Sequence, residues 1–233
     1  MSAAIGYYGR IATDGLVLYM DSSKRASYPG FGNSWSSVAK GQTVSGSLIN
    51  GAVYMPSNTS IFFDSTNDYC QLQALGLDYP LNISMVAIVP PGLAGNGIAV
   101  SFSDPTANNK SIGVNIGPEV SMAQIRAWYF SAATGFQAAI VSNPSFNTLY
   151  CVSANYTTSS INLYINGAFG NSLTLAQTKQ WTETSTSYNI GRLNRLSTIY
   201  YGGYLFQTTV YNRVLTASEI LQNYNAIRGR FGL

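Results

Sequence analysis

Histidine is absent from all 233 residues of the chain. It is the side chain whose ordinary pKa lies nearest neutrality. Its absence therefore excludes Ser-His-Asp and Cys-His nucleophilic sites, histidine acid–base catalysis and histidine metal sites. The sequence also lacks a phosphate-binding glycine loop and the Cys/His spacing of a zinc site. The available functional groups are carboxylates, amides, hydroxyls, arginine and lysine cations, and aromatic rings.

Charge is scarce as well. Only 9% of the residues are Asp, Glu, Lys or Arg, against about 25% in an average soluble protein. A monomer in solution usually carries more surface charge, which opposes association. The shortage favours a protein that buries surface against copies of itself or against a partner. The alternative is the neutral, Asn/Thr/Ser-rich surface of an extracellular β protein.

Targeting and membrane signals are missing too. No run of about 18 apolar residues occurs, so the sequence predicts no membrane-spanning helix. Residues 1–10 lack the basic and apolar regions of a secretory signal, which predicts synthesis in a cytoplasm. The formal net charge is +3. The basic residues form no stripe with interleaved aromatic side chains, so we expect no nucleic-acid partner.

The chain has two cysteines, Cys70 and Cys151, both in strand-like runs. A disulfide needs a specific geometry that spacing alone does not supply. Two buried free thiols fit a chain made in a reducing compartment better, and a disulfide remains the alternative.

Short strand-like runs recur about every ten residues, with turn residues between them, as in a β-sandwich. The expected strands are 15–20, 48–54, 59–64, 68–73, 82–89, 97–103, 111–117, 122–131, 136–142, 148–156, 160–166, 169–175, 186–191 and 203–212. Asn166-Gly167 predicts a type I′ hairpin turn. No linker divides the chain. We therefore expect an arm over 1–14 and one all-β, two-sheet antiparallel domain over 15–233.

One short helix is expected near the C-terminal end, over 216–228. Thr216 and Glu219 have the spacing of a capping box at its start. An apolar stripe follows and should dock on a sheet; it consists of Ile220, Leu221, Tyr224 and Ile227. Gly229 is the expected left-handed C-cap.

Several segments of the sequence, in order along the chain, resemble the concanavalin A-like, laminin G-type jelly-roll family. They are Gly15–Asp21 followed by Ser27–Gly30 and Trp35, the Phe62–Tyr69 run that resembles F-D-G-x-x-D-Y, the pair Tyr150–Tyr156 and Ile161–Gly167 that ends like L-Y-x-N-G, and the closing Tyr188–Ile220. The resemblance implies a jelly-roll sandwich. It leaves function open, because this fold serves lectins, glucanases, adhesion modules and phage particle proteins.

The resemblance also bears on catalysis. Glucanases of this superfamily carry E-x-D-x-x-E on one strand, whereas none of Glu119, Glu183 and Glu219 has an aspartate two residues later. Glycoside hydrolysis needs two flanking carboxylates, so we expect a protein that is not an enzyme. The alternative is a carbohydrate-active enzyme whose two carboxylates come from separate strands.

The run Asn223–Leu233 resembles the ending of such domains in tailed-phage structural proteins. The resemblance implies a virion component made in the host cytoplasm, such as a capsid decoration. Its partners would be other virion proteins or copies of itself in a homo-oligomer, with residues 2–10 as an anchoring arm. The alternative is a lectin-like module that binds surface glycans for host or surface recognition.

Two kinds of binding site are candidates. Aromatic side chains in loops predict sugar stacking, with Tyr28 and Trp35 in the long 22–47 region and Tyr200 and Tyr201 as the expected exposed pair. Oxygen-bearing side chains give a candidate calcium site, the only cofactor that the sequence proposes; these are Asp21, Asp64, Asn67 and Asp68. The favoured alternative is that Asp64, Asn67 and Asp68 form a turn with their own backbone.

Overall fold

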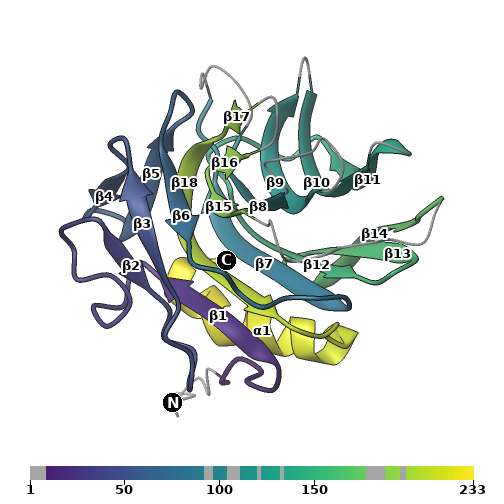
Figure 1. The fold of residues 1–233 in the computed structure, drawn as a ribbon, viewed down its shortest axis with the longest axis horizontal. Helices are drawn as coiled ribbons and strands as arrows, with labels where there is room; N and C mark the ends of the chain where they lie inside the picture. The colour runs from purple at the N-terminus through teal and green to yellow at the C-terminus, as the bar shows by residue number, and fades with distance from the viewer. Residues whose placement is uncertain are drawn as a thin grey trace, which may run out of the picture.

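The computed structural model describes residues 9–91, 97–103, 111–119, 122–131, 134–176, 187–194 and 198–233. These residues form two packed antiparallel sheets, one small hairpin and one helix (Figure 1). The sheets confirm the expected all-β jelly-roll sandwich.

Sheet A has eight strands, β1 (Leu16–Asp21), β4 (Val53–Met55), β5 (Ser60–Asp64), β7 (Leu81–Ile88), β12 (Leu149–Tyr156), β13 (Ser160–Ile165), β14 (Ala168–Thr174) and β18 (Gly202–Tyr211). Sheet B also has eight, β2 (Ser34–Ser36), β3 (Ser45–Ile49), β6 (Tyr69–Leu72), β8 (Ala99–Ser103), β9 (Ser111–Glu119), β10 (Met122–Ser131), β11 (Gly135–Ser142) and β15 (Ser187–Ile190). The hairpin pairs β16 (Arg192–Leu193) with β17 (Ile199–Tyr200).

The strand order explains how distant segments meet. Sheet A runs β14-β13-β12-β7-β18-β5-β4, and β1 also pairs with β18. Sheet B runs β11-β10-β9-β8-β15-β6-β3-β2. The last strand of the chain therefore lies inside sheet A, between strands from its first half.

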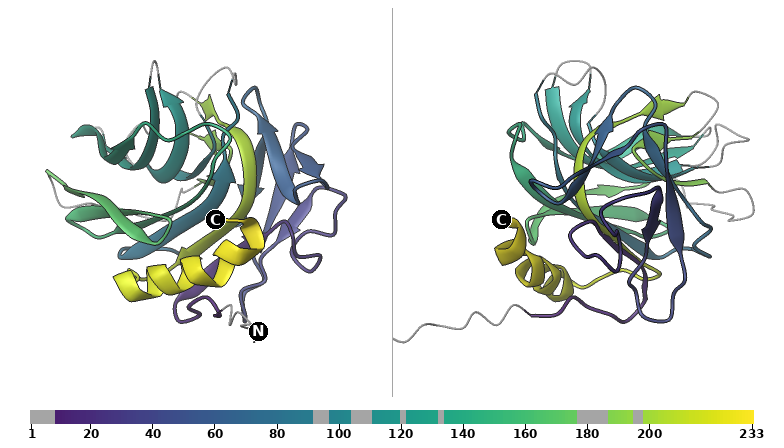
Figure 2. Two further views of the ribbon diagram at one scale, coloured as in Figure 1. Left: turned by 180° about the vertical axis from the view of Figure 1, so that it is seen from behind. Right: turned by 90° about the vertical axis from the view of Figure 1, so that its left-hand side faces the viewer.

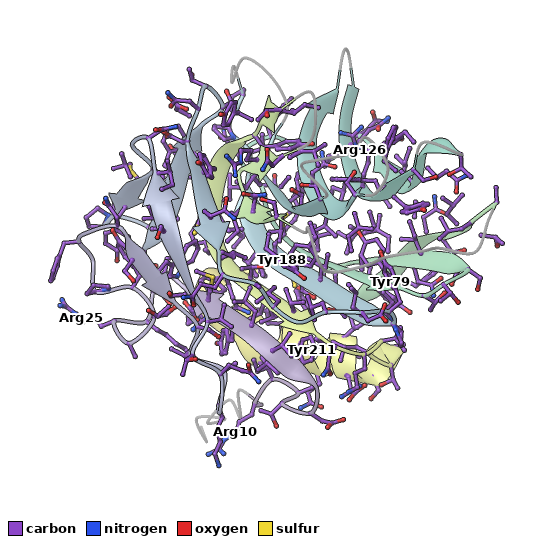
Figure 3. All side chains as sticks on the ribbon, in the orientation of Figure 1. Arg10, Arg25, Tyr79, Arg126, Tyr188 and Tyr211 are labelled. Atoms are coloured by element: carbon purple, nitrogen blue, oxygen red, sulfur yellow. The ribbon has the colours of Figure 1, made fainter. Side chains whose placement is uncertain are left out.

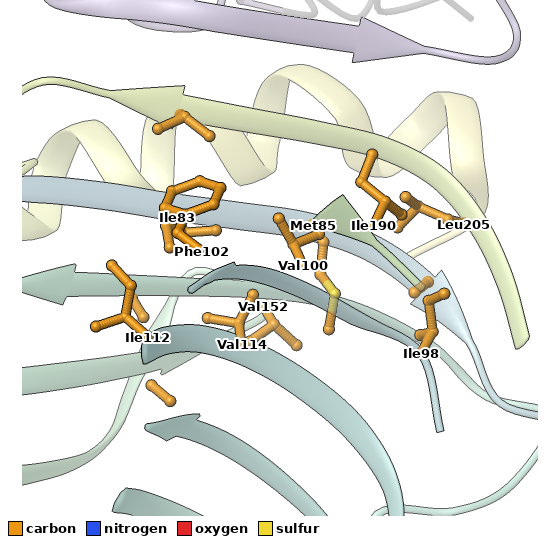
Figure 4. Close-up of a cluster of buried hydrophobic side chains, with 14 of the residues drawn as sticks. Ile83, Met85, Ile98, Val100, Phe102, Ile112, Val114, Val152, Ile190 and Leu205 are labelled. Carbon is orange, nitrogen blue, oxygen red and sulfur yellow. The ribbon is translucent and has the colours of Figure 1, made fainter. Parts of the chain in front are cut away.

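The core lies between the sheets, because alternate side chains of each strand point inward. Tyr188 points into it from β15, whereas Tyr211 lies beside β1 and the helix (Figure 3). Met85 and Val152 of sheet A face Val100 of sheet B (Figure 4). Burial at this scale, at roughly 1.5–3 kcal/mol for a large apolar side chain, is the main stabilising contribution to the fold.

One expected strand proves to be two. Residues 48–54 were predicted as a single strand, but β3 ends at Ile49 in sheet B and β4 begins at Val53 in sheet A. Asn50 and Gly51 adopt positive φ angles of 62° and 114°, so the chain turns there and crosses between the sheets. The 22–47 region, predicted as one long loop, also contains β2 and the start of β3.

The helix α1 (Ala217–Phe231) covers the outer face of sheet A (Figure 2). The predicted capping box is present: the Glu219 amide donates to Thr216 Oγ1 at 3.2 Å, and the Thr216 amide donates to Glu219 Oε2 at 2.8 Å. The predicted C-cap at Gly229 is wrong. The helix runs on to a left-handed Gly232, with φ 72°. Phe231 packs against Phe206 of the sheet at 5.7 Å between ring centroids, which favours the extra turn.

The apolar stripe docks on the sheet as predicted, except for one residue. Ile220 and Ile227 are buried and Tyr224 is partly buried, whereas Leu221 is 47% exposed. Leu221 lies about 100° around the helix from Ile220, which turns it toward solvent. The Asn166-Gly167 turn is confirmed by positive φ at both residues, 50° and 80°.

Both cysteines are free and buried, which confirms the thiol interpretation. Cys70 lies in the core between the sheets, and Cys151 lies under the helix on the opposite face of sheet A. Burial raises the pKa of both thiols, that of Cys151 to about 12.

The first described residues lie against the helix. The Ala12 amide donates to Asn223 Oδ1 at 2.7 Å, and Gln222 Nε2 donates to the Arg10 carbonyl at 2.7 Å. Residues 1–8 of the expected anchoring arm lie outside the described residues. A domain boundary at residue 15 stays a prediction.

Candidate functional site

An aromatic and polar surface lies on the outer face of sheet B, where the β16–β17 hairpin meets β6. We name it the tyrosine platform, made of Tyr69, Gln71, Arg192 and Tyr200, with the buried Asn189 as a hydrogen-bond partner of Arg192. Cys70 and Leu72 point into the core, so Tyr69 and Gln71 of the same strand must point outward. Tyr69, Arg192 and Tyr200 are each partly exposed.

The rings and the arginine of the platform are close together. Arg192 Cζ lies 3.6 Å from the centre of the Tyr69 ring, which is a close cation–π contact. The Tyr69 and Tyr200 rings are 6.3 Å apart and tilted by 44°. Stacking on Tyr69 occupies one side of the guanidinium, and Tyr200 lies on the same partly exposed surface.

Two amides fix the arginine. Arg192 Nη2 donates to Gln71 Oε1 at 2.7 Å and to Asn189 Oδ1 at 2.8 Å. Asn189 is fully buried and is held in turn by a 2.9 Å bond from its Nδ2 to Ser187 Oγ. The platform is thus rigid before any ligand arrives, which lowers the entropy cost of binding.

The hairpin is held over sheet B by a small apolar cluster. Leu193 and Tyr201 pack on Ala99 and Trp128, and Ser101 Oγ donates to the Arg192 carbonyl at 2.6 Å. Gly113 makes room for the indole, since a Cβ there would lie 2.7 Å from Trp128 Cζ2. These contacts position Arg192 and Tyr200 beside Tyr69.

The predicted sugar-stacking residues separate into two groups. Tyr200 lies at the surface of the platform. The expectation that Tyr201 is exposed beside it is wrong, because its ring closes the cluster under the hairpin and is only 5% exposed. The rings of Tyr28 and Trp35 belong to the core and offer no open face, although both residues come from a region predicted as a loop. Glycan binding itself stays a prediction.

Tyr28 shows why a loop aromatic can be structural. Its hydroxyl donates to the Gly32 carbonyl at 2.7 Å, and its ring lies 5.3 Å from that of Tyr54. Burial raises the pKa of Tyr28, and the neighbouring Tyr54 adds to the effect. These two contacts of Tyr28 hold the 22–33 segment against the sandwich.

The candidate calcium ligands do not come together as one set. Asp21 pairs with Gln207 on β18 and Asp64 pairs with Gly202 of the same strand, a separation of five residues or about 17 Å. Asp21 is fully buried and its Oδ2 lies 2.7 Å from Arg230 Nη1. Within the described residues no cluster of three acidic, cysteine or histidine side chains could hold a metal.

Asp64, Asn67 and Asp68 form the turn between β5 and β6. Asp64 Oδ1 accepts the amides of Thr66 at 2.8 Å and Asn67 at 3.4 Å, and Asp68 Oδ2 accepts the Asp64 amide at 3.2 Å. Burial opposes ionisation of Asp64, but these hydrogen bonds outweigh it and lower its pKa. The pKa of Asp68 is raised by burial and by the Asp64 charge. These side chains therefore stabilise their own turn, as expected under the favoured alternative to a calcium site.

The sequence interpretation missed Tyr69, Gln71, Asn189 and Arg192 as site residues. The alternation of β6, with Cys70 and Leu72 as core residues, could have marked Tyr69 and Gln71 as outward-facing. No local signal brings Arg192 onto Tyr69. The contact depends on the turn at Gly191, whose φ is 78°, and on the hairpin folding back over the sheet.

A family model for the concanavalin A-like lectin/glucanase superfamily of laminin G type matches residues 64–221, more than half of the chain. The chain belongs to this superfamily. Its two antiparallel sheets and its closing helix agree with the resemblance found in the sequence. A search of curated protein sequences finds no match.

Solved structures with the same fold have low sequence identity. The binding domain of botulinum neurotoxin DC in complex with SialylT superposes with a TM-score of 0.64 at 11% identity, covering 93% of this chain and 52% of that one. A structure of botulinum neurotoxin type C, whose cell entry depends on interaction with two ganglioside molecules, gives a TM-score of 0.63 at 12% identity and covers 91% of this chain and 51% of that one. Trypanosoma rangeli sialidase with the inhibitor DANA gives 0.60 at 13%, covering 92% and 33%.

This chain therefore spans about half the length of the toxin domains and a third of the sialidase. At these identities the likeness concerns the fold alone. The described part of the chain contains no helix that could span a bilayer.

Proposed function

We propose that the protein is a non-enzymatic adhesion domain that binds a glycan at the tyrosine platform. The observation that carries the proposal is the rigid, partly exposed group of two tyrosines and one arginine, with Arg192 Cζ 3.6 Å from the Tyr69 ring and anchored by two amides. A sugar ring would stack on Tyr200, and its hydroxyls would bond to amide and guanidinium groups at the rim. Binding sites of this kind combine aromatic faces with few, well-placed polar groups.

The carboxylates support a binding role over catalysis. Asp64 and Asp68 accept hydrogen bonds within their own turn, and Glu219 caps the helix and pairs with Arg213 at 2.6 Å. A hydrolase would need two carboxylates that flank a substrate bond instead. The side chains of Glu119 and Glu183 lie outside the described part of the chain.

A glycan array followed by calorimetry on the best neutral glycan tests the proposal. Tyr200→Ala should weaken the affinity about two- to tenfold, since an aromatic contact contributes about 0.5–1.5 kcal/mol. Phe169→Ala is the matched control, because this side chain is 61% exposed but lies on β14 of sheet A. Equal loss in both variants, or none in Tyr200→Ala, would reject the platform as the glycan site.

A second candidate function, a virion surface component, is favoured by a different observation. Charged residues are 9% of the chain, and several large apolar side chains are exposed, among them Phe31 at 75% and Phe169 at 61%. Such side chains suit an interface with a shell or with copies of the protein. A decoration that also holds glycans would serve both functions.

Quantitative mass spectrometry of gradient-purified phage particles from the source organism tests this second function. Many copies in fixed ratio to the major shell protein support a decoration, and a few copies support a tail or fibre adhesin. Absence from the particles would remove the virion function and leave the glycan-binding domain.

A further inference from the structure

A cleft lies between the N-terminal segment and the end of α1, away from the tyrosine platform. Residues 9–13 and the 38–40 loop form its walls, and its volume is about 360 Å³. This volume is in the range of small-molecule sites. We name it the arm–helix cleft. Arg10, one of its lining residues, lies at the N-terminal end of the described chain, below β1 (Figure 3).

Four of the twelve basic residues of the chain line the arm–helix cleft: Arg10, Lys24, Lys40 and Arg230. Arg230 is neutralised, because its Nη1 lies 2.7 Å from the buried carboxylate of Asp21. Within the described residues, the other three cations make no ion pair with a carboxylate. The cleft therefore gathers three uncompensated positive charges in a chain whose net charge is +3.

The floor of the cleft is apolar. Ile11, Leu16, Val38 and Ile227 line it, together with the ring of Tyr19. Lys24 Nζ donates to the Tyr19 hydroxyl at 2.9 Å, which holds the ammonium group at the edge of this floor. Positive groups at the rim and apolar surface below are complementary to a molecule with one anionic group and one apolar face.

Hydrogen bonds hold the walls of the cleft in place. None of these bonds uses the charged groups of Arg10, Lys24 or Lys40. Tyr211 donates its hydroxyl proton to the Ala12 carbonyl at 2.9 Å. Asn223 and Gln222 of the helix make the two hydrogen bonds to residues 12 and 10 described above. The Val38 amide donates to the Tyr19 carbonyl at 2.7 Å. The cleft is therefore formed in advance, so binding need not order either wall.

We propose that the arm–helix cleft binds a compact organic anion, a carboxylate or phosphate group on a body the size of one sugar ring. The oxyanion lies among Arg10, Lys24 and Lys40, and the body covers the apolar floor. A polyanion such as nucleic acid does not fit this arrangement, because the three cations line one open cleft and form no stripe along the surface. The cleft is separate from the tyrosine platform, and the proposal stands independently of glycan binding there.

Isothermal titration calorimetry in about 20 mM salt, where charge attraction is little screened, tests the proposal with four probes. Methyl glucuronide carries the carboxylate, and glucose 6-phosphate carries the phosphate, each on one sugar ring. Methyl glucoside is the neutral counterpart, and inorganic phosphate is the bare ion. We expect one of the two organic anions to bind at least tenfold more tightly than methyl glucoside and inorganic phosphate. Which one binds distinguishes an acidic sugar from a phosphate-bearing metabolite or headgroup.

The variant Arg10→Gln/Lys40→Gln should reduce that affinity at least tenfold, and its melting temperature should stay unchanged because both side chains are exposed. Arg25→Gln/Arg228→Gln removes the same charge from exposed positions outside the cleft and should keep the affinity. Equal loss in both variants, no binding of either organic anion, or equally tight binding of inorganic phosphate would overturn the proposal. Tyr200→Ala should leave anion binding intact, so failure here is distinct from failure at the platform.

Discussion

Arg230, in the last turn of α1, reaches the carboxylate of Asp21 at the end of β1, with 2.7 Å between Nη1 and Oδ2. The aspartate is fully buried and also accepts hydrogen bonds from the Ser23 amide and hydroxyl. One ion pair thus ties the C-terminal helix to the first strand of the sandwich.

Removing the cation from this pair should destabilise the fold. Arg230→Met leaves the Asp21 charge buried with fewer partners, which should lower the free energy of unfolding by about 1–2 kcal/mol. The value is below that of a fully buried pair because the arginine side chain is 35% exposed. Urea unfolding measures it. Arg228→Met, at an exposed position of the same helix, is the control and should change stability by less than about 0.5 kcal/mol.

The helix cap should make the stability of the fold depend on pH in the acid range. Hydrogen bonding to Arg213, with help from the Thr216 amide, lowers the pKa of Glu219 from 4.5 to about 2. A carboxylate with a lowered folded-state pKa stabilises the fold fully above its unfolded-state pKa. This contribution is lost as the pH falls from about 4.5 toward 2. Glu219→Gln should therefore be less stable at pH 6 and show a shallower loss between pH 4.5 and 2.

Chemical denaturation at several pH values gives this comparison. Asp78→Asn, which removes an exposed carboxylate outside the cap, should retain the wild-type slope. An identical slope in Glu219→Gln would show that the cap does not contribute to the acid dependence.

Neither thiol should react with a thiol reagent in the native protein. Burial raises the pKa of Cys151 to about 12 and that of Cys70 also, so neither thiolate forms near neutrality. Ellman's reagent should detect no thiol in native protein and both thiols in guanidinium chloride. Fewer than two after unfolding without reductant would indicate a disulfide.

Gly113 should tolerate no side chain. A Cβ at this position would lie 2.6 Å from the Val100 carbonyl and 2.7 Å from the Trp128 indole, under the hairpin cluster. Gly113→Ala should therefore lower the free energy of unfolding by about 1–3 kcal/mol and weaken any glycan binding at the platform. Gly9→Ala is the control, because a Cβ there meets nothing within 4 Å. A native-like melting temperature for Gly113→Ala would contradict the packing argument.

Calcium should have no effect on stability. Asp64 Oδ1 already accepts two amides of its own turn, and Asp21 lies far from that turn in a salt bridge. We expect the same melting temperature in calcium chloride and in a chelator, measured by calorimetry. A rise in calcium that disappears in Asp64→Asn would restore the metal site.

Local signals predicted local structure well. The Thr216–Glu219 capping box and the Asn166-Gly167 turn depend on residues a few positions apart, and both are present as expected. The C-cap was misplaced because Gly229 and Gly232 satisfy the same local rule. Packing of Phe231 on Phe206, which is distant in sequence, favours the later one.

Burial was harder to predict because it depends on pairing between distant segments. Tyr201 follows the exposed-looking Tyr200, yet the hairpin turns it onto Trp128. The same fold-back brings Arg192 to Tyr69, and so creates the platform from residues about 120 positions apart. Similarly, no local pattern reveals that the 48–54 run divides between two sheets.

The position of β18 inside sheet A has a consequence for synthesis. This strand pairs with β7, β5 and β1, so its neighbours are made long before it. Until residues 202–211 leave the ribosome, one edge of β7 is unpaired. During this time β1 and β5 have no strand that links them to β7. We expect sheet A to close late, with nascent strand edges exposed to chaperones until the last strand inserts.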